Sequence, residues 1–179
     1  MRRIKDNPKD LEIRFATESD SGLLLDFIKR LAAYEKKSDQ VVATVSDIKK
    51  SLFVNKYAEA IIAYYKDNPV GFAIFFHNFS TFMGKPGIYI EDLYVDEKSR
   101  NIGIGSSILS FIADLALKRG CSILEFSVLK WNKPSIRFYK NLGAEEKNEW
   151  SSYRFSGRAL KRMASPPGDL PGEPINLNV

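Results

Sequence analysis

The sequence contains very few of the residues that build disulfides and metal centres. Cys121 is the only cysteine and His77 the only histidine among 179 residues. An internal disulfide and a multi-cysteine metal site are therefore excluded, and a catalytic triad would depend on His77 alone. The apolar run around Cys121 predicts a buried, inert thiol. We expect His77 to be structural, and we expect no bound metal.

Long apolar runs are also missing. Stretches such as residues 70–76 end well short of the roughly 18 residues that a membrane helix needs. The basic segment 1–10 has no apolar signal segment behind it. We therefore expect a cytoplasmic protein with no membrane partner.

The formal net charge of +5 is unevenly distributed. Residues 98–140 contain eight basic and two acidic side chains, so this segment carries +6 and the remainder −1. The segment favours an anionic ligand, although a solvated basic face gives the same count. A nucleic-acid surface needs basic and aromatic residues arrayed together, and we expect no nucleic-acid partner.

Hydrophobic patterning predicts a mixed α/β fold. The segments expected to form strands are residues 11–16, 58–66, 70–79, 87–95, 121–129 and 149–155. The segments with helical spacing are residues 17–37, 44–53, 106–120 and 133–143, the first of them behind Thr17 as N-cap. This order predicts a mixed, mostly antiparallel sheet of six to seven strands with helices on both faces. We expect one domain over residues 11–164 and a Pro-rich, disordered tail over 165–179.

The stretch "SRNIGIGSS", residues 99–107, places two glycines between a strand and a helix. Such a loop presents free backbone N–H groups and the positive end of the helix dipole, which suits a phosphate, although an ordinary turn before a helix looks the same. A nucleoside triphosphate loop is excluded because "GSS" stands where G-K-[ST] is required.

A nicotinamide dinucleotide site is a stronger alternative for the same loop. Glu125 follows Gly105 by twenty residues, where a ribose-binding acid would lie. Against it, Ile108 occupies the third motif position, where a small residue is needed, and Glu91 and Asp92 interrupt the preceding strand.

Two segments together resemble the GNAT N-acetyltransferases. "VDEKSRNIGIGSSIL" is similar to their [QR]-x-x-G-x-[GA] loop, with Arg100, Gly103 and Gly105 in the motif positions. "VLKWNKPSIRFYKNLGA" is similar to their later W-N-x-[PA]-[SA]-x-x-[FL]-Y-x-x-x-G-[AF] segment. "FIKRLAAYEK", "YIEDLYV" and "WNKPSIRFYK" further resemble the diamine (spermidine/spermine) and thialysine acetyltransferases. The likeness extends from about Leu11 to Met163.

The resemblance implies an acetyl-CoA-dependent N-acetyltransferase that acts by direct transfer on the primary amine of a diamine, polyamine or thialysine-like amino acid. It also implies a homodimer. A protein or peptide amine as the acceptor, a nicotinamide oxidoreductase, and a binding module without turnover are the alternatives.

The same resemblance implies roles for individual residues. Tyr139 would be the general acid beside the coenzyme sulfur, where packing in the core is the alternative, and Glu91 would be the base through water. The coenzyme would be held by backbone groups of Leu93 and Val95, by the loop Arg100, Asn101, Ile102, Gly103, Ile104, Gly105 and Ser106, and by Asn132 and Tyr139.

Three carboxylates are candidates for binding a cationic amine: Glu91, Asp92 and Glu35. A solvated helix end is an equal alternative for Glu35. Strict strand alternation puts Glu91 on one face with Tyr89, Leu93 and Val95, and Asp92 on the other with Ile90 and Tyr94. If one of these acids is buried, desolvation raises its pKa and suits it to act as a base.

Two departures from the resembled family bear on function. Asn101 replaces the loop's usual second glycine, which is tolerable because asparagine adopts left-handed conformations. Ser80 and Phe82 stand where the polyamine enzymes carry an acid and a tryptophan. We therefore expect a weaker hold on a long polycation.

Overall fold

The computed structural model describes residues 8–147, 149 and 151–164. Contacts group the chain into two compact units, Met1–Asn132 and Lys133–Val179, which we describe separately. The single domain expected over residues 11–164 stays a prediction. The expected Pro-rich tail lies outside the described residues.

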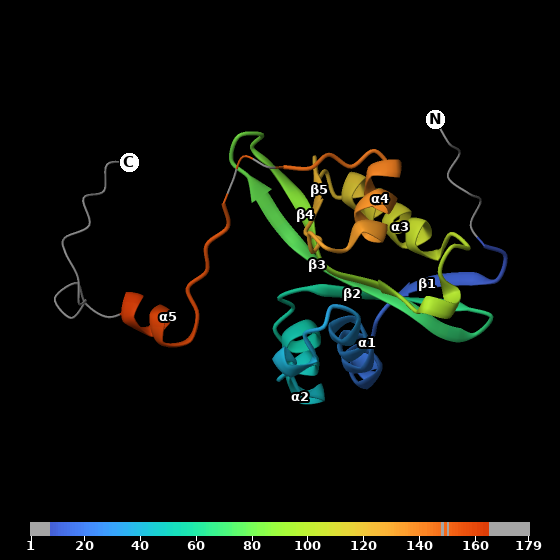
Figure 1. The fold of residues 1–179 in the computed structure, drawn as a ribbon, viewed down its shortest axis with the longest axis horizontal. Helices are drawn as coiled ribbons and strands as arrows, with labels where there is room; N and C mark the ends of the chain where they lie inside the picture. Colours follow the sequence, from blue (N-terminus) through green and yellow to red (C-terminus); the bar gives the residue numbers. More distant parts are fainter. Residues whose placement is uncertain (1–7, 148, 150, 165–179) are drawn as a thin grey trace. The chain divides into compact units, whose positions relative to one another are not determined.

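The first unit is built on one mixed sheet (Figure 1). Its strands, which neighbour each other in chain order, are β1 (Leu11–Phe15), β2 (Glu59–Tyr65), β3 (Asn68–Ser80), β4 (Lys85–Val95) and β5 (Leu124–Phe126). β1 to β4 pair antiparallel, and β5 pairs parallel to β4. The mixed, mostly antiparallel sheet is confirmed, but the expected six to seven strands are wrong, because the described residues form five.

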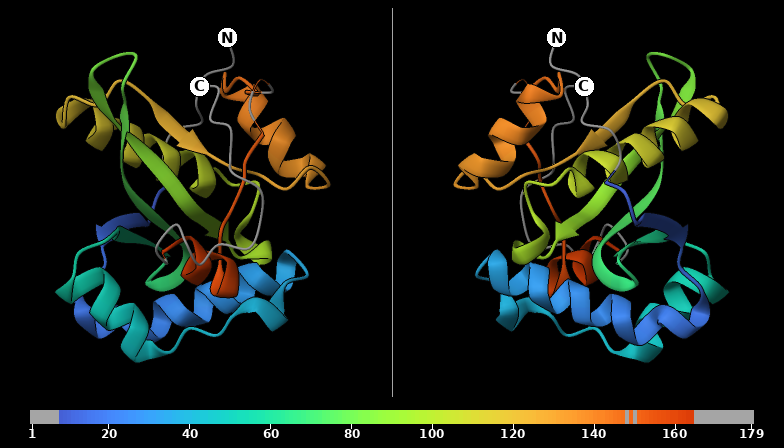
Figure 2. Two further views of the ribbon diagram at one scale, coloured as in Figure 1. Left: turned by 90° about the vertical axis from the view of Figure 1, so that its left-hand side faces the viewer. Right: turned by 90° about the vertical axis from the view of Figure 1, so that its right-hand side faces the viewer.

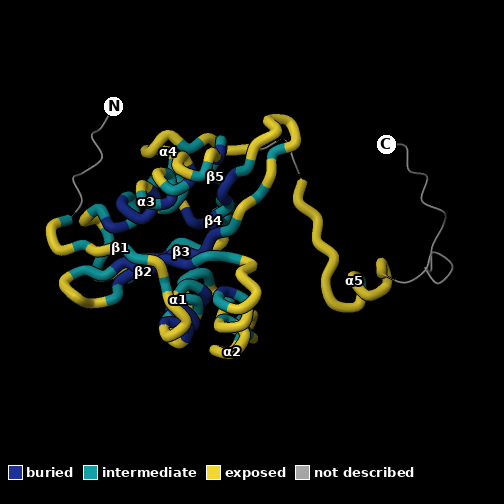
Figure 3. The backbone as a smooth tube through the Cα atoms, turned by 180° about the vertical axis from the view of Figure 1, so that it is seen from behind, coloured by how far each residue is buried: buried dark blue, intermediate teal, exposed yellow. Residues whose placement is uncertain are grey.

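Helices cover both faces of this sheet, as expected (Figures 1 and 2). α1 (Ser21–Tyr34) and α2 (Val45–Lys49), which continues into a π-helical turn, lie on one face, where Phe27 of α1 stacks on Phe72 of β3 with ring centres 5.4 Å apart. α3 (Ile104–Lys118) lies on the other face. The buried residues follow the strands and the inner sides of these helices (Figure 3).

The start of α1 depends on one buried ion pair. Asp20 is 9% exposed and accepts hydrogen bonds from Arg14 Nη1 at 2.8 Å and from the Thr17 backbone N–H at 2.7 Å. Arg14 also donates to the Tyr64 hydroxyl at 2.7 Å, which ties β1 to β2 and to the helix entry. The Arg14 guanidinium holds the pKa of Asp20 well below its usual range.

The second unit contains α4 (Lys133–Asn141) and α5 (Gly157–Met163). α4 ends as its sequence predicts: Gly143 takes φ +93°, and the Ala144 N–H donates to the Tyr139 carbonyl at 3.1 Å.

The strand expected over residues 149–155 is wrong. Residues 151–156 form no strand, and Tyr153 is 93% exposed. Aromatic alternation indicates β propensity, but a strand needs a neighbour with unpaired peptide groups, and the described part of this unit offers none. The sequence pattern also missed α5, and it extended β5 over residues 121–129, of which only Leu124–Phe126 pair.

Replacing Asp20 tests the role of the ion pair. Asp20→Asn leaves Arg14 half-buried without its carboxylate, so we expect the free energy of unfolding to fall by about 2 kcal/mol at pH 7. The loss shrinks as the pH falls below the usual pKa of an aspartate, because the unfolded wild-type chain then takes up a proton on Asp20 that the folded state does not take up. Urea denaturation measures both effects.

Asp26→Asn is the matched control, since Asp26 pairs with Arg30 on the exposed side of α1. Its expected change is within about 0.5 kcal/mol. Equal losses in the two variants would contradict this account of the helix entry.

Candidate active site

β4 and β5 pair for a short distance and then part. The pairs are Ile88 with Leu124, Tyr89 with Glu125 and Ile90 with Phe126. β4 continues to Val95, and no described strand pairs with its β5 edge beyond Ile90. This leaves an open strand edge.

The peptide groups that face the open edge can be identified. The Asp96 N–H donates to the Val70 carbonyl at 2.8 Å, towards β3. Successive N–H groups of a strand alternate between its two edges, so those of Leu93 and Val95 point to the open side. These are the two residues whose backbone the resemblance assigns to the coenzyme.

A β-bulge at Glu91 corrects the predicted faces of β4. Asp92 pairs with Ile74 and Ile90 pairs with Phe75, so Glu91 is an extra residue opposite β3. Asp92 therefore shares a face with Tyr94, as expected, but Ile90 lies on the opposite face. Strict alternation across residues 90–92 was the wrong assumption, because a bulge shifts the phase of the strand by one residue.

The three predicted substrate acids are close enough for their charges to interact. Burial raises the pKa of Asp92 to about 6, and the negative charges of Glu91 and Glu35 contribute to the increase. Glu35 caps the C-terminus of α1, and Glu91 is exposed at the bulge. The site therefore combines one partly buried carboxyl with two neighbours of the same charge, an arrangement that attracts a cation.

The glycine loop has the shape that its sequence predicts. Asn101 takes φ +65° and Gly103, the N-cap of α3, takes φ +105°. Among described groups, we find no acceptor for the amides of residues 101–106. A side chain at Gly103 would be strained by its left-handed conformation and would meet the ring of Pro8 at about 3.7 Å. Free amides at the positive end of α3 fit a pyrophosphate.

Aromatic contacts join the loop to two distant segments. The Arg100 guanidinium lies 4.7 Å from the Tyr34 ring centre and 5.7 Å from that of Tyr94, and its Nε donates to the Val95 carbonyl at 2.9 Å. The Tyr34 hydroxyl donates to Asn132 Oδ1 at 3.1 Å. Tyr34 was not among the predicted site residues; its only signal was its place in "FIKRLAAYEK", one of the segments that resemble the diamine and thialysine acetyltransferases.

Tyr139 belongs to the second unit, on α4. Its ring centre is 5.2 Å from that of Phe138, and burial raises its pKa to about 12. Its place beside the groups of the first unit stays a prediction.

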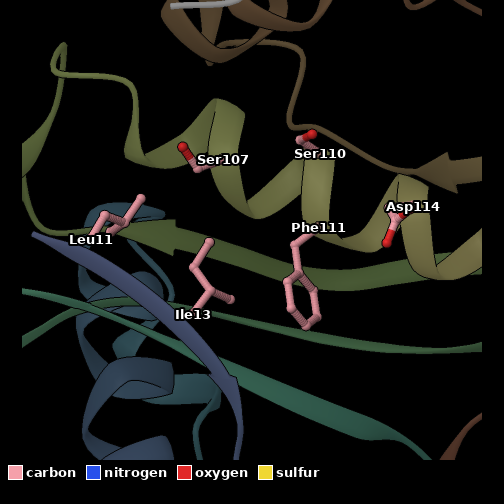
Figure 4. Close-up of a pocket in the computed structure, with 6 residues that line it drawn as sticks. All are labelled: Leu11, Ile13, Ser107, Ser110, Phe111 and Asp114. Carbon is pink, nitrogen blue, oxygen red and sulfur yellow. The ribbon is translucent and has the colours of Figure 1, made fainter. Parts of the chain in front are cut away.

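A separate cavity of about 280 Å³ lies between β1 and α3 (Figure 4). It is lined by Leu11, Ile13, Ser107, Ser110, Phe111 and Asp114, none of which is a predicted site residue. Two of its polar side chains already have partners: Ser107 Oγ donates to the Gly103 carbonyl at 3.1 Å, and Asp114 pairs with Lys118 at 2.7 Å. We do not assign this cavity to the predicted reaction.

No helix in the described ranges is long and apolar enough to cross a membrane. No group of three histidine, cysteine or acidic side chains able to hold a metal occurs among the residues placed by the structure.

Comparison with known families connects this geometry to a chemistry. A model of the acetyltransferase (GNAT) family matches residues 26–144. Thialysine N-epsilon-acetyltransferase from Sus scrofa is 38% identical over 164 residues, covering 85% of this chain and 96% of that protein. L-ornithine N5-acetyltransferase from Arabidopsis thaliana is 27% identical over 197 residues, covering 84% of this chain and 86% of that protein. A spermidine/spermine N(1)-acetyltransferase-like protein from Homo sapiens is 31% identical, with 86% of this chain and 24% of that protein covered.

Solved structures show the same fold. An integron cassette protein from V. cholerae superposes with a TM-score of 0.75 at 24% identity, covering 88% of this chain and 99% of that one. An aminoglycoside acetyltransferase from an uncultured soil metagenomic sample superposes with a TM-score of 0.70 at 22% identity, covering 84% and 99%.

The acidic cluster predicts a pH-dependent effect on stability. The raised pKa means that the folded state holds the Asp92 proton more tightly than the unfolded chain, so stability is lost as the pH rises from the usual aspartate pKa to about 6, and the loss persists above that pH. Asp92→Asn removes that cost. We expect its Tm to exceed the wild-type Tm by a margin that is small at pH 4 and grows up to about pH 7.

Calorimetry over this pH range measures the margin, with Asp39→Asn, an exposed acid on a surface turn, as the control. A margin that does not change with pH would show that Asp92 is not destabilised by its surroundings.

Proposed function

The chain belongs to the GNAT family of N-acetyltransferases, and from this premise we propose that it moves the acetyl group of acetyl-CoA directly to the primary amine of a small cationic molecule. One observation carries the proposal: the negative charges of Glu91 and of Glu35, at the end of α1, act on the partly buried Asp92 of β4, the strand whose edge β5 leaves open. The thialysine and ornithine acetyltransferases among the relatives support a small amine as the acceptor.

The described residues fit acetyl-CoA, which supplies an activated thioester when bound. The free amides of residues 101–106 and the α3 dipole would hold its pyrophosphate. The N–H groups of Leu93 and Val95 would bind the amides of its pantetheine arm along the open edge, and Asn132 would bind the same arm. The nicotinamide alternative gains no support from any of the relatives.

The carboxylates would bind and deprotonate the amine. An alkylamine has a pKa of about 10.4, so neutralising it at pH 7 costs about 4 to 5 kcal/mol. A base with a pKa of about 6 accepts a proton at neutral pH more effectively than an ordinary aspartate, which favours Asp92. Glu91, which the resemblance assigns as the base, is exposed and would relay the proton through water.

Tyr139 would protonate the leaving thiolate. Burial raises its pKa to about 12, so the hydroxyl carries its proton at neutral pH, but it is a weaker acid than an exposed tyrosine. This role requires α4 to bring the hydroxyl to the open edge of β4.

Glu35 would bind a second cationic group of the acceptor, which favours a diamine or a basic amino acid. Phe82, 93% exposed at the β3–β4 turn, adds no charge for a longer polycation. Following the resemblance, we also propose a cytoplasmic homodimer, whose stoichiometry light scattering would measure.

Removing the Tyr139 hydroxyl tests the proposed acid. Tyr139→Phe should lower kcat by about 100-fold, the usual order for a general acid, while acetyl-CoA still stabilises the protein against heat. Tyr153→Phe, at a fully exposed tyrosine of the same unit, should leave kcat unchanged. Near-normal turnover by Tyr139→Phe would remove this residue from the mechanism.

The pH profile identifies the base. In the wild type, kcat/KM for the amine should increase with pH around pH 6, where the base loses its proton. This limb of the profile lies at a lower pH than the pKa of the amine itself. Asp92→Asn should lose the limb near pH 6. If the limb persists in Asp92→Asn and is lost in Glu91→Gln, Glu91 is the base instead.

A further inference from the structure

Tyr34, the last residue of α1, touches two segments that are far apart in the sequence. Its ring faces the Arg100 side chain, at the start of the glycine loop, and its hydroxyl reaches Asn132. We propose that Tyr34 is a positioning residue that fixes the two contact regions for acetyl-CoA relative to each other; this rests on the proposed function.

The hydroxyl contact orients the Asn132 amide. Asn132 is only 6% exposed, and its Oδ1 accepts the Tyr34 O–H at 3.1 Å. With Oδ1 turned to the Tyr34 hydroxyl, the amide presents Nδ2 as its donor group, which would bind a carbonyl of the pantetheine arm. Without the hydroxyl, Oδ1 loses one of the contacts that hold the amide in this orientation.

The ring contact holds the start of the loop. The Arg100 guanidinium lies against the rings of Tyr34 and Tyr94, and its Nε bonds the Val95 carbonyl. Cation–π contacts of this kind become stronger when the cation is partly desolvated, and the Arg100 side chain is 31% exposed. The contacts fix the backbone immediately before the free amides of residues 101–106.

Neighbouring contacts keep Tyr34 itself in place. The Trp131 ring lies 5.9 Å from the Tyr34 ring, and Lys36 Nζ lies 6.0 Å from the Trp131 ring centre. Arg30, one turn earlier on α1, pairs with Asp96 at 3.0 Å. The last turns of α1 are thereby joined to the end of β4 and to the segment after β5. Since Glu35 follows Tyr34, the same helix end also carries an acid of the amine site.

Tyr34→Phe removes the hydroxyl and keeps the ring. We expect the KM for acetyl-CoA to rise about fivefold, the range of one neutral hydrogen bond, with kcat and the KM for the amine unchanged. Isothermal titration with coenzyme A should show the same loss of affinity. Tyr57→Phe, at a tyrosine that is 72% exposed, is the matched control and should change neither.

A double-mutant cycle separates positioning from general packing. If the hydroxyl acts through Asn132, Tyr34→Phe should have no further effect on coenzyme affinity in the Asn132→Ala background. Additive losses in the cycle would overturn the proposal, as would an unchanged acetyl-CoA KM in Tyr34→Phe.

A shortened donor distinguishes the two ends of Tyr34. Acetyl-pantetheine lacks the nucleotide. Tyr34→Phe should raise the KM for this short donor as it does for acetyl-CoA. Arg100→Gln should raise the KM for acetyl-CoA but not the KM for acetyl-pantetheine. A Tyr34→Phe penalty confined to acetyl-CoA would contradict the assignment of the hydroxyl to the pantetheine end. If the wild-type protein neither binds coenzyme A nor transfers acetyl, the proposed function itself is wrong. That result differs from a failure of the Tyr34 proposal alone, in which the wild type remains active.

Discussion

One extra residue in β4 determines which N–H groups face the open strand edge and on which face of the sheet Asp92 lies. Because Glu91 bulges out against β3, the strand beyond it is shifted in phase by one position. Without the bulge, the N–H groups of Leu93 and Val95 would point to β3 and would be used in the sheet. With it, they face the edge that β5 leaves open, and Asp92 turns to the α1 face, beside Glu35. The donor groups and the acid cluster are thus consequences of the same local irregularity.

Several of the basic side chains that give residues 98–140 their positive charge are engaged in contacts within the protein. The basic surplus of residues 98–140 is partly neutralised by ion pairs with acids outside the segment: Arg119 with Glu59, and Lys140 with Glu146. Arg100 is directed to aromatic rings rather than into the loop. The attraction for an anion therefore comes mainly from backbone amides and the α3 dipole, while the attraction for a cation comes from side-chain carboxylates.

The sequence correctly predicted the features that depend only on interactions between residues close together in the chain. The Thr17 cap, the end of α4 at Gly143 and the left-handed Asn101 follow from interactions within a few residues, and all three are found. The bulge at Glu91 depends on the register against β3, and the contacts of Tyr34 depend on packing across the fold, so neither has a signature in the chain itself. The strand expected over 149–155 failed for the same reason, because alternation cannot supply a pairing partner.

The central claim is direct acetyl transfer from acetyl-CoA to a small cationic amine. The most direct measurement is amine-dependent thiol release from acetyl-CoA, with product masses determined, for diamines, polyamines, thialysine, ornithine, neutral amines and N-terminal peptides. The account predicts acetylated product from a diamine or a basic amino acid, and much less from neutral amines of the same length. Release that no amine increases, or product from peptides alone, would contradict it.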